Sequence, residues 1–492
     1  MKLAELLTDF PIQHTVPDLE VHSVTENSTK ADAHTVFVCI RGANTDGHRF
    51  APDAYVRGCR VFITENDLPL ADDAFILSVS DTRKALAMLA CKLYENPSHR
   101  MHLIGITGTK GKTTTAQLLA HILNTNGTPC GYIGTNGITY GNAHIPTRNT
   151  TPDAVTLQKT LCDMLSAGVS AAVIEVSSQA LMQYRVDGIH FETVLFTNLS
   201  PDHIGQNEHP NLEHYKACKH RLFTDFGAET AIYNADDPVA LDMLKNTSAI
   251  KRLSCSVKDT EADFFATDVT LLRNGQMLGV AFTLHHEKKS LACSLPLIGT
   301  VNVGNALLAM TTANKVFEIP LNDAAEALSR ASVAGRSELI SLPSGACVII
   351  DYAHNAASLR QLLSTLREYR PARLIVLFGS IGERAKMRRR ELGEVAAELS
   401  DLAVLTSDNP GNEPPEQIID EIANAFSGFS TPFLKIPNRA TAIQTAIGLT
   451  HTGDILVLAG KGHETYQLIG NKKIPFCERS LVTEEIQRVL IK

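Results

Sequence analysis

Residues 102–115 read HLIGITGTKGKTTT, a short apolar run followed by a glycine-rich loop, a lysine and three threonines. The residues after it, 116–123, carry their apolar side chains on one helical face. Strand, glycine loop and helix in this order are typical of phosphate-binding loops, because glycine lets the backbone approach a phosphate and a helix N-terminus offers unpaired N–H groups. In such a loop Lys112 reaches the terminal phosphates and Thr113 offers its hydroxyl to magnesium. The spacing departs from the general pattern, which requires glycine where this chain has Ile106.

The rest of the chain alternates between β-branched runs and helical periods, which predicts an α/β fold. A polar segment with a proline, 96–101, separates an N-terminal α/β unit from the phosphate loop. From 263 to 295 the apolar residues alternate in twos around Asn274-Gly275, which predicts a small antiparallel sheet beside the central parallel one. After Gly335 the alternation restarts as a doubly wound, Rossmann-like domain. The expected domains are 1–97, 98–334 and 335–492.

Composition restricts the classes of partner. With 44% apolar and 20% charged residues the chain has the make-up of a folded globular protein rather than a disordered one. A net charge of −8 argues against general binding to nucleic acid or to an anionic membrane. The ten cysteines have no metal-finger spacing, which fits a reducing compartment, and the N-terminus shows no export signal. We expect a cytoplasmic monomer with small-molecule substrates, no nucleic acid partner and no stable membrane association.

Two strands that follow the phosphate loop carry candidate magnesium ligands. Glu175 ends the buried strand 171–175, and Asp202-His203 come soon after the next apolar run, 193–199. The carboxyl ends of parallel strands gather at one sheet edge, so these side chains are expected near Lys112 and Thr113. Alone, a glutamate that ends a strand is more often a solvated residue than a ligand, and His203 would be an ordinary loop histidine. The phosphate loop beside them reverses that expectation.

The chain resembles one family over residues 105–464. The segments that carry the resemblance are GITGTKGKTTT, NTTPDA, EVSSQALMQYRVDG, TNLSPDHIG, YKACKHRLF, NADDP, GTVNVGN, AGRSE, DYAHN, SDNPGNE and AGKGHE. They are similar to those of the Mur ligases, ATP-dependent amide-forming enzymes of peptidoglycan precursor synthesis. Within the family, the resemblance is closest to the third ligase, which adds a diamino acid to UDP-N-acetylmuramoyl-L-alanyl-D-glutamate. The N-terminal Asn27-Ser28, VFVCIRG and DGHRF resemble its UDP-binding domain.

The resemblance implies a mechanism and its residues. ATP activates the γ-carboxyl of the D-glutamate as an acyl phosphate, and an amine then displaces phosphate. The implied cofactors are ATP, Mg²⁺ and a carbamylated lysine. The implied catalytic residues are Lys112, Lys219, His203 and Arg336. The implied magnesium ligands are Thr113, Glu175, His203 and the carbamate of Lys219. The implied pathway connects the enzyme with cell wall biogenesis, cell shape, the cell cycle and cell division.

The resemblance also implies three sets of binding residues. The set for ATP is Gly108, Thr109, Lys110, Gly111, Lys112, Thr113, Thr114, Asn302, Asp351 and His354. The set for the UDP-N-acetylmuramoyl peptide is Ser28, Asn149, Thr150, Thr151, Ser177, Gln183 and Arg185. The set for the amino acid is Arg384, Asp408, Asn409, Glu413, Gly460 and Glu464.

Departures from the family pattern concern the substrates. The uracil-pocket Asp-Ser-Arg reads Asn27-Ser28-Thr29. The Asp-Asn-Pro-Arg motif, whose arginine forks onto the distal carboxylate of diaminopimelate, ends here in Gly411. Without that fork a buried carboxylate would lack a partner, and Glu413 could pair with a side-chain ammonium instead. L-lysine, or a similar diamino acid such as ornithine, is therefore expected over meso-diaminopimelate, unless Arg388 or Arg389 restores the fork.

Three rival functions are weaker. A switch-type GTPase needs an Asn-Lys-x-Asp motif, and the candidates at 314–317 and 471–474 lack the aspartate. A folylpolyglutamate or cyanophycin ligase shares the ATP chemistry but is not expected to carry the separate N-terminal unit. A non-catalytic ATP-binding scaffold would not need the full set of metal and lysine residues.

Overall fold

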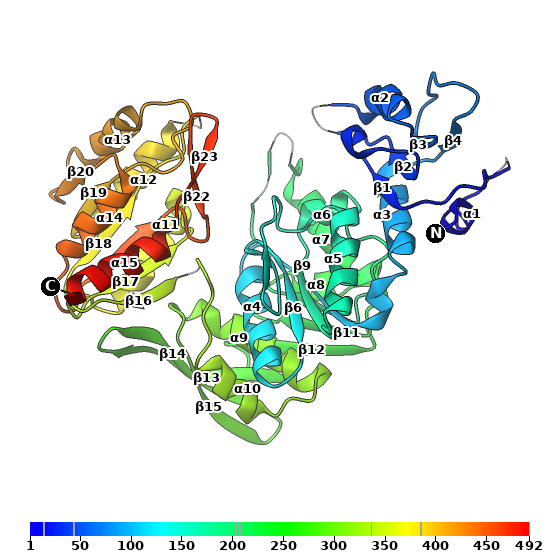
Figure 1. The fold of residues 1–492 in the computed structure, drawn as a ribbon. Coiled ribbons are helices and arrows are strands. Elements are labelled where there is room, and N and C mark those ends of the chain that lie inside the picture. The colour runs from blue at the N-terminus through cyan, green and yellow to red at the C-terminus, as the bar shows by residue number, and fades with distance from the viewer. Residues whose placement is uncertain are drawn as a thin grey trace. The chain divides into compact units, whose positions relative to one another are not determined.

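The computed structural model describes residues 1–12, 15–42, 45–202, 204–205, 208–335, 337–383 and 386–491. It divides into two compact units, one of residues 1–265 and 307–320 and the other of residues 266–306 and 321–492 (Figure 1). The division falls inside one strand, β13 (Phe264–Asn274), and one helix, α9 (Val301–Val316). Among the residues described, no helix is both long and apolar enough to cross a membrane.

The first unit begins with a four-stranded parallel sheet in the order β1-β2-β3-β4. Its strands are apolar except for a serine or threonine at their ends, and β2 and β3 are buried along their whole length. The strands are β1 (Ser23–Thr25), β2 (Thr35–Val38), β3 (Val61–Thr64) and β4 (Phe75–Ser78). The helices around it are α1 (Leu3–Leu6), α2 (Ala51–Val56) and α3 (Thr82–Leu93), with 3-10 turns at Ser28–Lys30, Gly47–Phe50 and Pro97–Arg100.

A larger sheet in the same unit has the strand order β12-β11-β10-β5-β9-β6-β7-β8. It is parallel from β12 to β6, and β7 and β8 are antiparallel. The strands are β5 (His102–Thr107), β6 (Cys130–Gly134), β7 (Gly137–Tyr140), β8 (Ala143–Ile145), β9 (Ala171–Glu175), β10 (Thr193–Phe196), β11 (Thr230–Asn234) and β12 (Lys251–Ser256). The helices are α4 (Lys112–Thr125), α5 (Ala154–Ser166), α6 (Ser178–Met182), α7 (Leu212–Thr224) and α8 (Ala240–Met243).

The sheet order explains where the chemistry gathers. β5 lies between β9 and β10, and all three run parallel, so the segments that follow them leave the sheet at one edge. Gly105 belongs to β5 and not to the phosphate loop. A Cβ there would lie 3.0 Å from the ring of Phe191, so strand packing requires this glycine. The glycine that precedes Ile106 is therefore explained by packing within β5 and not by contact with a phosphate.

The second unit contains the predicted antiparallel strands, β13, β14 (Met277–His286) and β15 (Lys289–Leu295). The tight turn between β13 and β14 falls at Gly275, where φ is +59°, as the Asn-Gly signal predicts. The hairpin groups with the C-terminal unit, whereas the sequence predicts it inside 98–334. Hydrogen bonds explain the grouping: the Arg273 guanidinium donates to the carbonyls of Tyr369 and Gly453, and the Tyr369 hydroxyl donates to Gly279 O at 2.8 Å.

The C-terminal sheet has the order β16-β17-β21-β18-β19-β20, and only β16 is antiparallel to its neighbour. Its strands are β16 (Glu338–Ser341), β17 (Cys347–Asp351), β18 (Leu374–Phe378), β19 (Leu402–Leu405), β20 (Phe433–Lys435) and β21 (Ile455–Ala459), and a separate hairpin joins β22 (Tyr466–Ile469) to β23 (Lys472–Pro475). The helices are α10 (Leu321–Leu328), α11 (Ala356–Glu368), α12 (Met387–Leu399), α13 (Pro415–Ala423), α14 (Arg439–Gly448) and α15 (Glu478–Ile491), with a 3-10 turn at Asn424–Phe426. This is the doubly wound arrangement expected after Gly335, and its strand ends place the loops that follow β17, β19 and β21 at one edge.

Candidate active site

The phosphate loop joins β5 to α4 and is held by the residues that follow β10. Gly108 has φ +150°, and a Cβ there would lie 1.9 Å from Thr197 Oγ1, so only glycine fits. The Asn198 backbone carbonyl accepts from Thr109 N at 2.8 Å, and its side-chain Oδ1 accepts from Lys110 N at 2.9 Å. Gly111, at φ +84°, turns the chain into the helix. The loop is therefore preformed, with a helix N-terminus at its end.

Lys112 opens α4 and folds back over the loop. Its Nζ donates to the carbonyls of Gly108 at 2.7 Å and Thr109 at 3.0 Å. The ammonium thus lies on the loop that the sequence assigns to phosphate binding, where it is a fixed counter-charge for an anion.

Glu175 ends β9 and is fully buried. Its carboxylate accepts from the hydroxyl of Thr113 at 2.9 Å, from the hydroxyl of Tyr132 at 2.5 Å and from Thr135 N at 3.0 Å. Burial, and next the charge of Glu175, raise the pKa of the Tyr132 hydroxyl well above its ordinary value, so it stays a hydrogen-bond donor. Carboxylate and hydroxyl oxygens are the donors Mg²⁺ prefers, so this pair fits the ion that the sequence implies.

Lys219 lies on α7 and is 1% exposed. Its Nζ donates to Gly108 O at 2.9 Å and lies 4.5 Å from the ring centre of Tyr215. Burial is the main cause that lowers the pKa of Lys219 well below its ordinary value, and the charge of Lys112 lowers it further. Both causes favour the neutral amine, which is the nucleophilic form of a lysine side chain.

Several residues predicted to bind the nucleotide-sugar peptide lie beside Glu175. The Thr151 hydroxyl donates to Glu175 O at 2.7 Å and lies 3.3 Å from the Ser177 hydroxyl. Arg185 donates to Thr151 O at 2.9 Å and to Gln183 Oε1 at 2.7 Å. Thr150 Oγ1 lies 3.1 Å from Thr135 Oγ1, and Asn149 precedes it in the same loop. The structure therefore joins this set to the magnesium candidates through Thr151.

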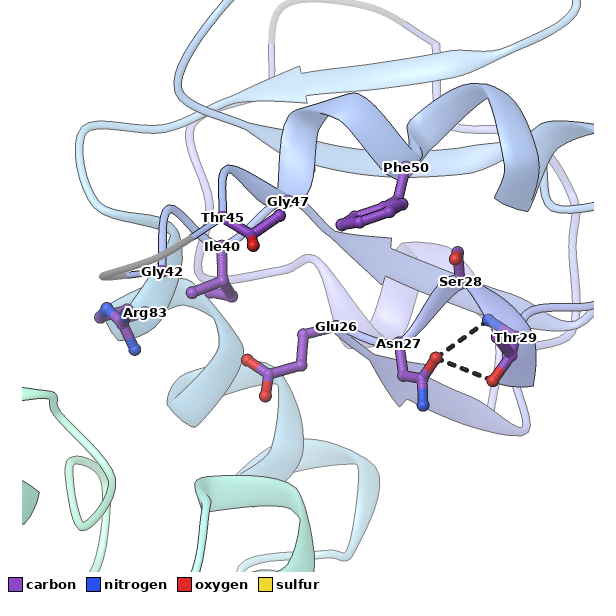
Figure 2. A pocket seen from close by; sticks show the side chains of 10 residues that line it. All are labelled: Glu26, Asn27, Ser28, Thr29, Ile40, Gly42, Thr45, Gly47, Phe50 and Arg83. Atoms are coloured by element: carbon purple, nitrogen blue, oxygen red, sulfur yellow. Dashed lines mark hydrogen bonds between the residues drawn. The ribbon is translucent and has the colours of Figure 1, made fainter. Parts of the chain in front are cut away.

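The N-terminal sheet holds a cavity of about 480 Å³ (Figure 2). Ser28, which the sequence assigns to the nucleotide-sugar peptide, lines it, while Asn27 Oδ1 accepts from both the backbone N and the hydroxyl of Thr29. The sequence did not single out three charged or aromatic lining residues: Glu26, Phe50 and Arg83. Burial is the main cause that raises the pKa of the Glu26 carboxyl. Phe50 stands in the DGHRF segment, so that segment was the available signal for it, and Glu26 and Arg83 had none.

In the second unit, three of the residues predicted for ATP hydrogen-bond within their own segment of the chain. The Asp351 carboxylate accepts from Ser337 N at 2.7 Å and from Ala353 N at 2.9 Å. Asn302 Nδ2 donates to Ile298 O at 2.8 Å, one turn before it on the chain. His354 Nδ1 lies 2.9 Å from Tyr352 O. Each of these side chains is thereby oriented by its own loop or turn.

Four of the residues predicted for the amino acid, Asp408, Asn409, Gly460 and Glu464, meet around a lysine that the prediction omitted. Lys461, fully buried, donates from Nζ to Asn409 Oδ1 at 3.0 Å and to Glu464 Oε2 at 2.9 Å, and lies 3.5 Å from Asp408 Oδ1. At Gly460, φ is +111°, and a Cβ would lie 2.8 Å from Asp408 Oδ2. Lys461 stands inside the AGKGHE segment, so the sequence did contain a signal for it.

Glu413 differs from its expected position. Its carboxylate pairs with the guanidinium of Arg389, which is 1% exposed and also donates to Glu421 Oε2 at 2.7 Å. Glu413 is therefore committed to an internal ion pair rather than presented to a substrate ammonium, and Arg389 is not presented as a fork. The backbone of Gly411 has φ +59°, a conformation that residues with a side chain rarely adopt. The backbone at this position therefore also favours glycine.

Three predicted residues, His203, Arg336 and Arg384, lie outside the described residues. Thr114, the last predicted residue of the phosphate loop, lies in the first turn of α4.

Models of known protein families match this chain in three successive parts. Family models match residues 20–94 (Mur ligase family, catalytic domain), 106–313 (Mur ligase middle domain) and 335–462 (Mur ligase, glutamate ligase domain). The UDP-N-acetylmuramoyl-L-alanyl-D-glutamate–2,6-diaminopimelate ligase of Caldanaerobacter subterraneus subsp. tengcongensis is 36% identical, with 98% of each chain covered. The ligase of the same name from Chlorobaculum tepidum is 39% identical over 93% of this chain and 91% of that protein.

A solved structure of a ligase with this name superimposes on the chain with a TM-score of 0.73 at 28% identity, and it covers 100% of this chain and 99% of that one. The three-domain α/β fold class expected from the sequence is thereby confirmed. The domain boundaries at 97/98 and 334/335 stay a prediction.

Proposed function

We propose, from the premise that this chain belongs to the Mur ligase family of ATP-dependent amide-forming ligases in peptidoglycan synthesis, that it adds a diamino acid to UDP-N-acetylmuramoyl-L-alanyl-D-glutamate. The names and full-length similarity of its relatives support this substrate. The structural observation that carries the proposal is Lys219, a buried lysine whose Nζ donates to the carbonyl of Gly108 in the phosphate loop.

The reaction needs activation because a carboxylate is not an electrophile. The glutamate carboxylate attacks the γ-phosphorus of ATP, the bond to ADP breaks, and an acyl phosphate forms. The neutral amine of the amino acid then attacks the acyl carbon, phosphate leaves, and the amine loses a proton. Lys112 and the backbone N–H groups of the loop oppose the negative charge that collects in the first step.

Thr113 and Glu175 would hold Mg²⁺, which when bound offsets phosphate charge. We also propose that the neutral amine of Lys219 attacks carbon dioxide and loses a proton to give a carbamate, an anion able to act as a further metal ligand. Acetate is the probe: phosphate release by Lys219→Ala should be partly restored by acetate and not by methylamine. Rescue by methylamine alone would show that the cation is what matters.

For the amino acid we favour meso-diaminopimelate, the alternative in the sequence analysis, over L-lysine. Relatives with 36% and 39% identity over nearly the whole chain carry diaminopimelate in their names. L-lysine remains the second candidate because Gly411 offers no guanidinium and the Arg389 guanidinium is paired with Glu413 and Glu421.

The deciding experiment supplies ATP, the UDP-muramoyl dipeptide and an equal mixture of the two amino acids, and measures the amount of each tripeptide product together with phosphate release. We expect at least tenfold more diaminopimelate product, about 1.4 kcal/mol in transition-state binding. A preference for L-lysine would restore the expectation drawn from Gly411. Release with neither, but with a folate and glutamate, would overturn the proposed function itself. We also expect a cytoplasmic enzyme that is a monomer, and light scattering of the purified chain tests the monomeric state.

A further inference from the structure

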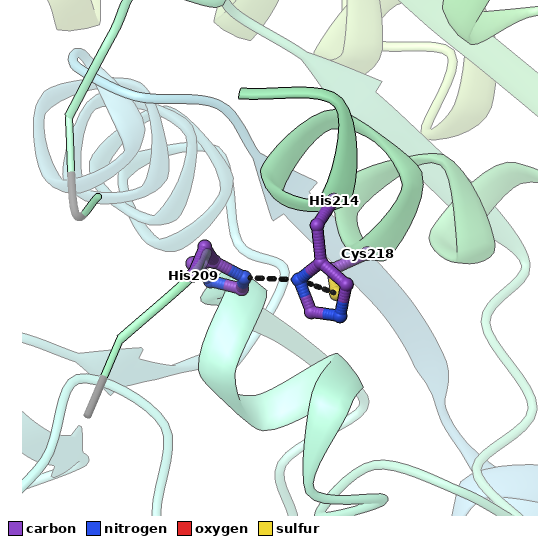
Figure 3. Close-up of side chains that lie close together, drawn as sticks. All are labelled: His209, His214 and Cys218. Atoms are coloured by element: carbon purple, nitrogen blue, oxygen red, sulfur yellow. Dashed lines mark hydrogen bonds between the residues drawn. The ribbon is translucent and has the colours of Figure 1, made fainter. Parts of the chain in front are cut away.

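A cluster of three metal-binding side chains lies outside the residues assigned to the reaction. It consists of His209, His214 and Cys218, whose ligand atoms all lie within 4.8 Å of one another (Figure 3). His209 Nδ1 is 2.9 Å from His214 Nδ1, and Cys218 Sγ is 3.7 Å from the same His214 atom. His209 precedes α7, while His214 and Cys218 are one turn apart on that helix. The backbone therefore places all three at one point.

These separations are close to those that one tetrahedral ion requires. With Zn–N bonds of about 2.05 Å and a Zn–S bond of about 2.3 Å, tetrahedral angles put two nitrogens about 3.3 Å apart and nitrogen and sulfur about 3.6 Å apart. Two of the three separations, 2.9 Å between the histidines and 3.7 Å between His214 and Cys218, differ from these by a few tenths of an ångström. The third, between His209 and Cys218, is at most 4.8 Å, so these two side chains have to approach each other to share one ion. Small side-chain rotations would admit the ion.

The surroundings orient the ligands. His209 is fully buried, and its second ring nitrogen, Nε2, lies 2.8 Å from the Ser178 hydroxyl. Histidines that bind metal through one nitrogen commonly use the other in this way, which fixes the tautomer and the ring plane. His214 N donates to the N-cap Asn211 at 2.8 Å, which sets the first turn of α7.

We propose that His209, His214 and Cys218 form a binding site for a borderline-soft divalent cation, Zn²⁺ being the type, separate from the oxygen-lined magnesium site at Thr113 and Glu175. Two imidazoles and a thiolate select such an ion over Mg²⁺, which prefers oxygen. The three ligands leave one tetrahedral position for water.

The site would act on the helix that carries Lys219. Tyr215 and Lys219 share the face of α7 that meets the phosphate loop: the Tyr215 hydroxyl donates to Thr109 Oγ1 at 3.2 Å, and Lys219 Nζ donates to Gly108 O. His214 and Cys218 occupy the adjacent face, one residue earlier in each turn. An ion there would tie residue 209 to two turns of α7 and hold the position of Lys219.

Cobalt tests the site in the full chain, because Co²⁺ replaces Zn²⁺ and a thiolate ligand produces a charge-transfer absorption band. With excess Mg²⁺ and ATP present to occupy the oxygen-lined site, we expect one Co²⁺ per chain with this band and its loss when Zn²⁺ is added. Cys218→Ala should abolish the band, and His214→Gln should weaken Co²⁺ binding at least tenfold. His214 is partly exposed, so the second variant serves if Cys218→Ala fails to fold.

Cys162→Ala and His220→Gln are the matched controls, a cysteine on α5 and another histidine of α7. Both should bind Co²⁺ as the unaltered chain does. A missing thiolate band, a band that survives Cys218→Ala, or equal losses in the controls would overturn the proposal. None of these outcomes depends on ligase activity, so failure of the metal site and failure of the proposed function can be told apart.

Discussion

The Thr113 hydroxyl donates to the carboxylate of Glu175 across 2.9 Å, although 62 residues separate them in the chain. The contact forms because β5 and β9 are neighbouring parallel strands. The first turn of α4, which follows β5, therefore meets Glu175 at the end of β9. This contact places a hydroxyl and a buried carboxylate at one point beside the phosphate loop.

Glu175→Gln should lower the rate of phosphate release by about 10²-fold or more. Glutamine keeps the shape of the side chain and a carbonyl acceptor, but it loses the negative charge that attracts a metal ion. The Mg²⁺ concentration needed for half-maximal rate should also rise. A titration of rate against Mg²⁺ measures both. Glu192→Gln, which alters the partner of His102, is the control and should leave the Mg²⁺ dependence unchanged. An unaltered Mg²⁺ dependence in Glu175→Gln would remove this residue from the metal site.

Lys112→Ala should reduce phosphate release by about 10²-fold or more, since the loop would lose its fixed counter-charge as charge shifts in the transition state. Single-turnover measurement at saturating ATP separates this loss from weaker ATP binding. Lys159→Ala, which removes only an exposed pair with Asp163, should be as active as the unaltered chain. Near-normal turnover in Lys112→Ala would exclude the loop from the chemistry.

Arg439→Met should lower the free energy of unfolding by about 3–5 kcal/mol, because it leaves the fully buried carboxylate of Glu478 without its partner. Arg439 also donates to Ser407 O and Ala459 O, so it joins the two loops that carry Asp408 and Lys461. The double change Arg439→Met/Glu478→Leu should recover much of the loss. Urea denaturation measures both.

The control for this buried ion pair is an ion pair at the surface. Arg360→Met removes a surface ion pair with Glu398 and should cost less than about 1 kcal/mol. If it destabilises the chain as much as Arg439→Met does, burial is not the reason for the effect.

The lowered pKa of the Asp242 carboxyl predicts that stability depends on pH. Hydrogen bonds from Lys216 on α7, and next from Lys245, lower the pKa of its carboxyl from 3.8 to about 2. A carboxyl with a lowered folded-state pKa stabilises the fold above its unfolded pKa and loses that effect as protons bind. The melting temperature of Asp242→Asn should therefore lie below that of the unaltered chain above pH 3.8, and the difference should shrink as the pH falls toward 2. A gap that widens on acidification would contradict the assignment.

The sequence by itself determined the elements whose causes are local. Glycines at 108 and 111 before Lys112 predict a phosphate loop because each supplies a backbone conformation within a few residues of the helix that follows. Asn274-Gly275 predicts its hairpin for the same reason, and β-branched runs between helical periods predict the parallel sheets.

Only the tertiary structure decided the features that depend on residues distant in the chain. Gly105 proved to be a packing position because Phe191 lies against it, and Glu413 proved to be an internal partner because α12 brings Arg389 to it. The His209, His214 and Cys218 cluster likewise needs the turn of α7 and the approach of the preceding segment. Local propensity cannot specify such pairs, since their energy comes from burial and charge pairing that exist only once the strands and helices have packed.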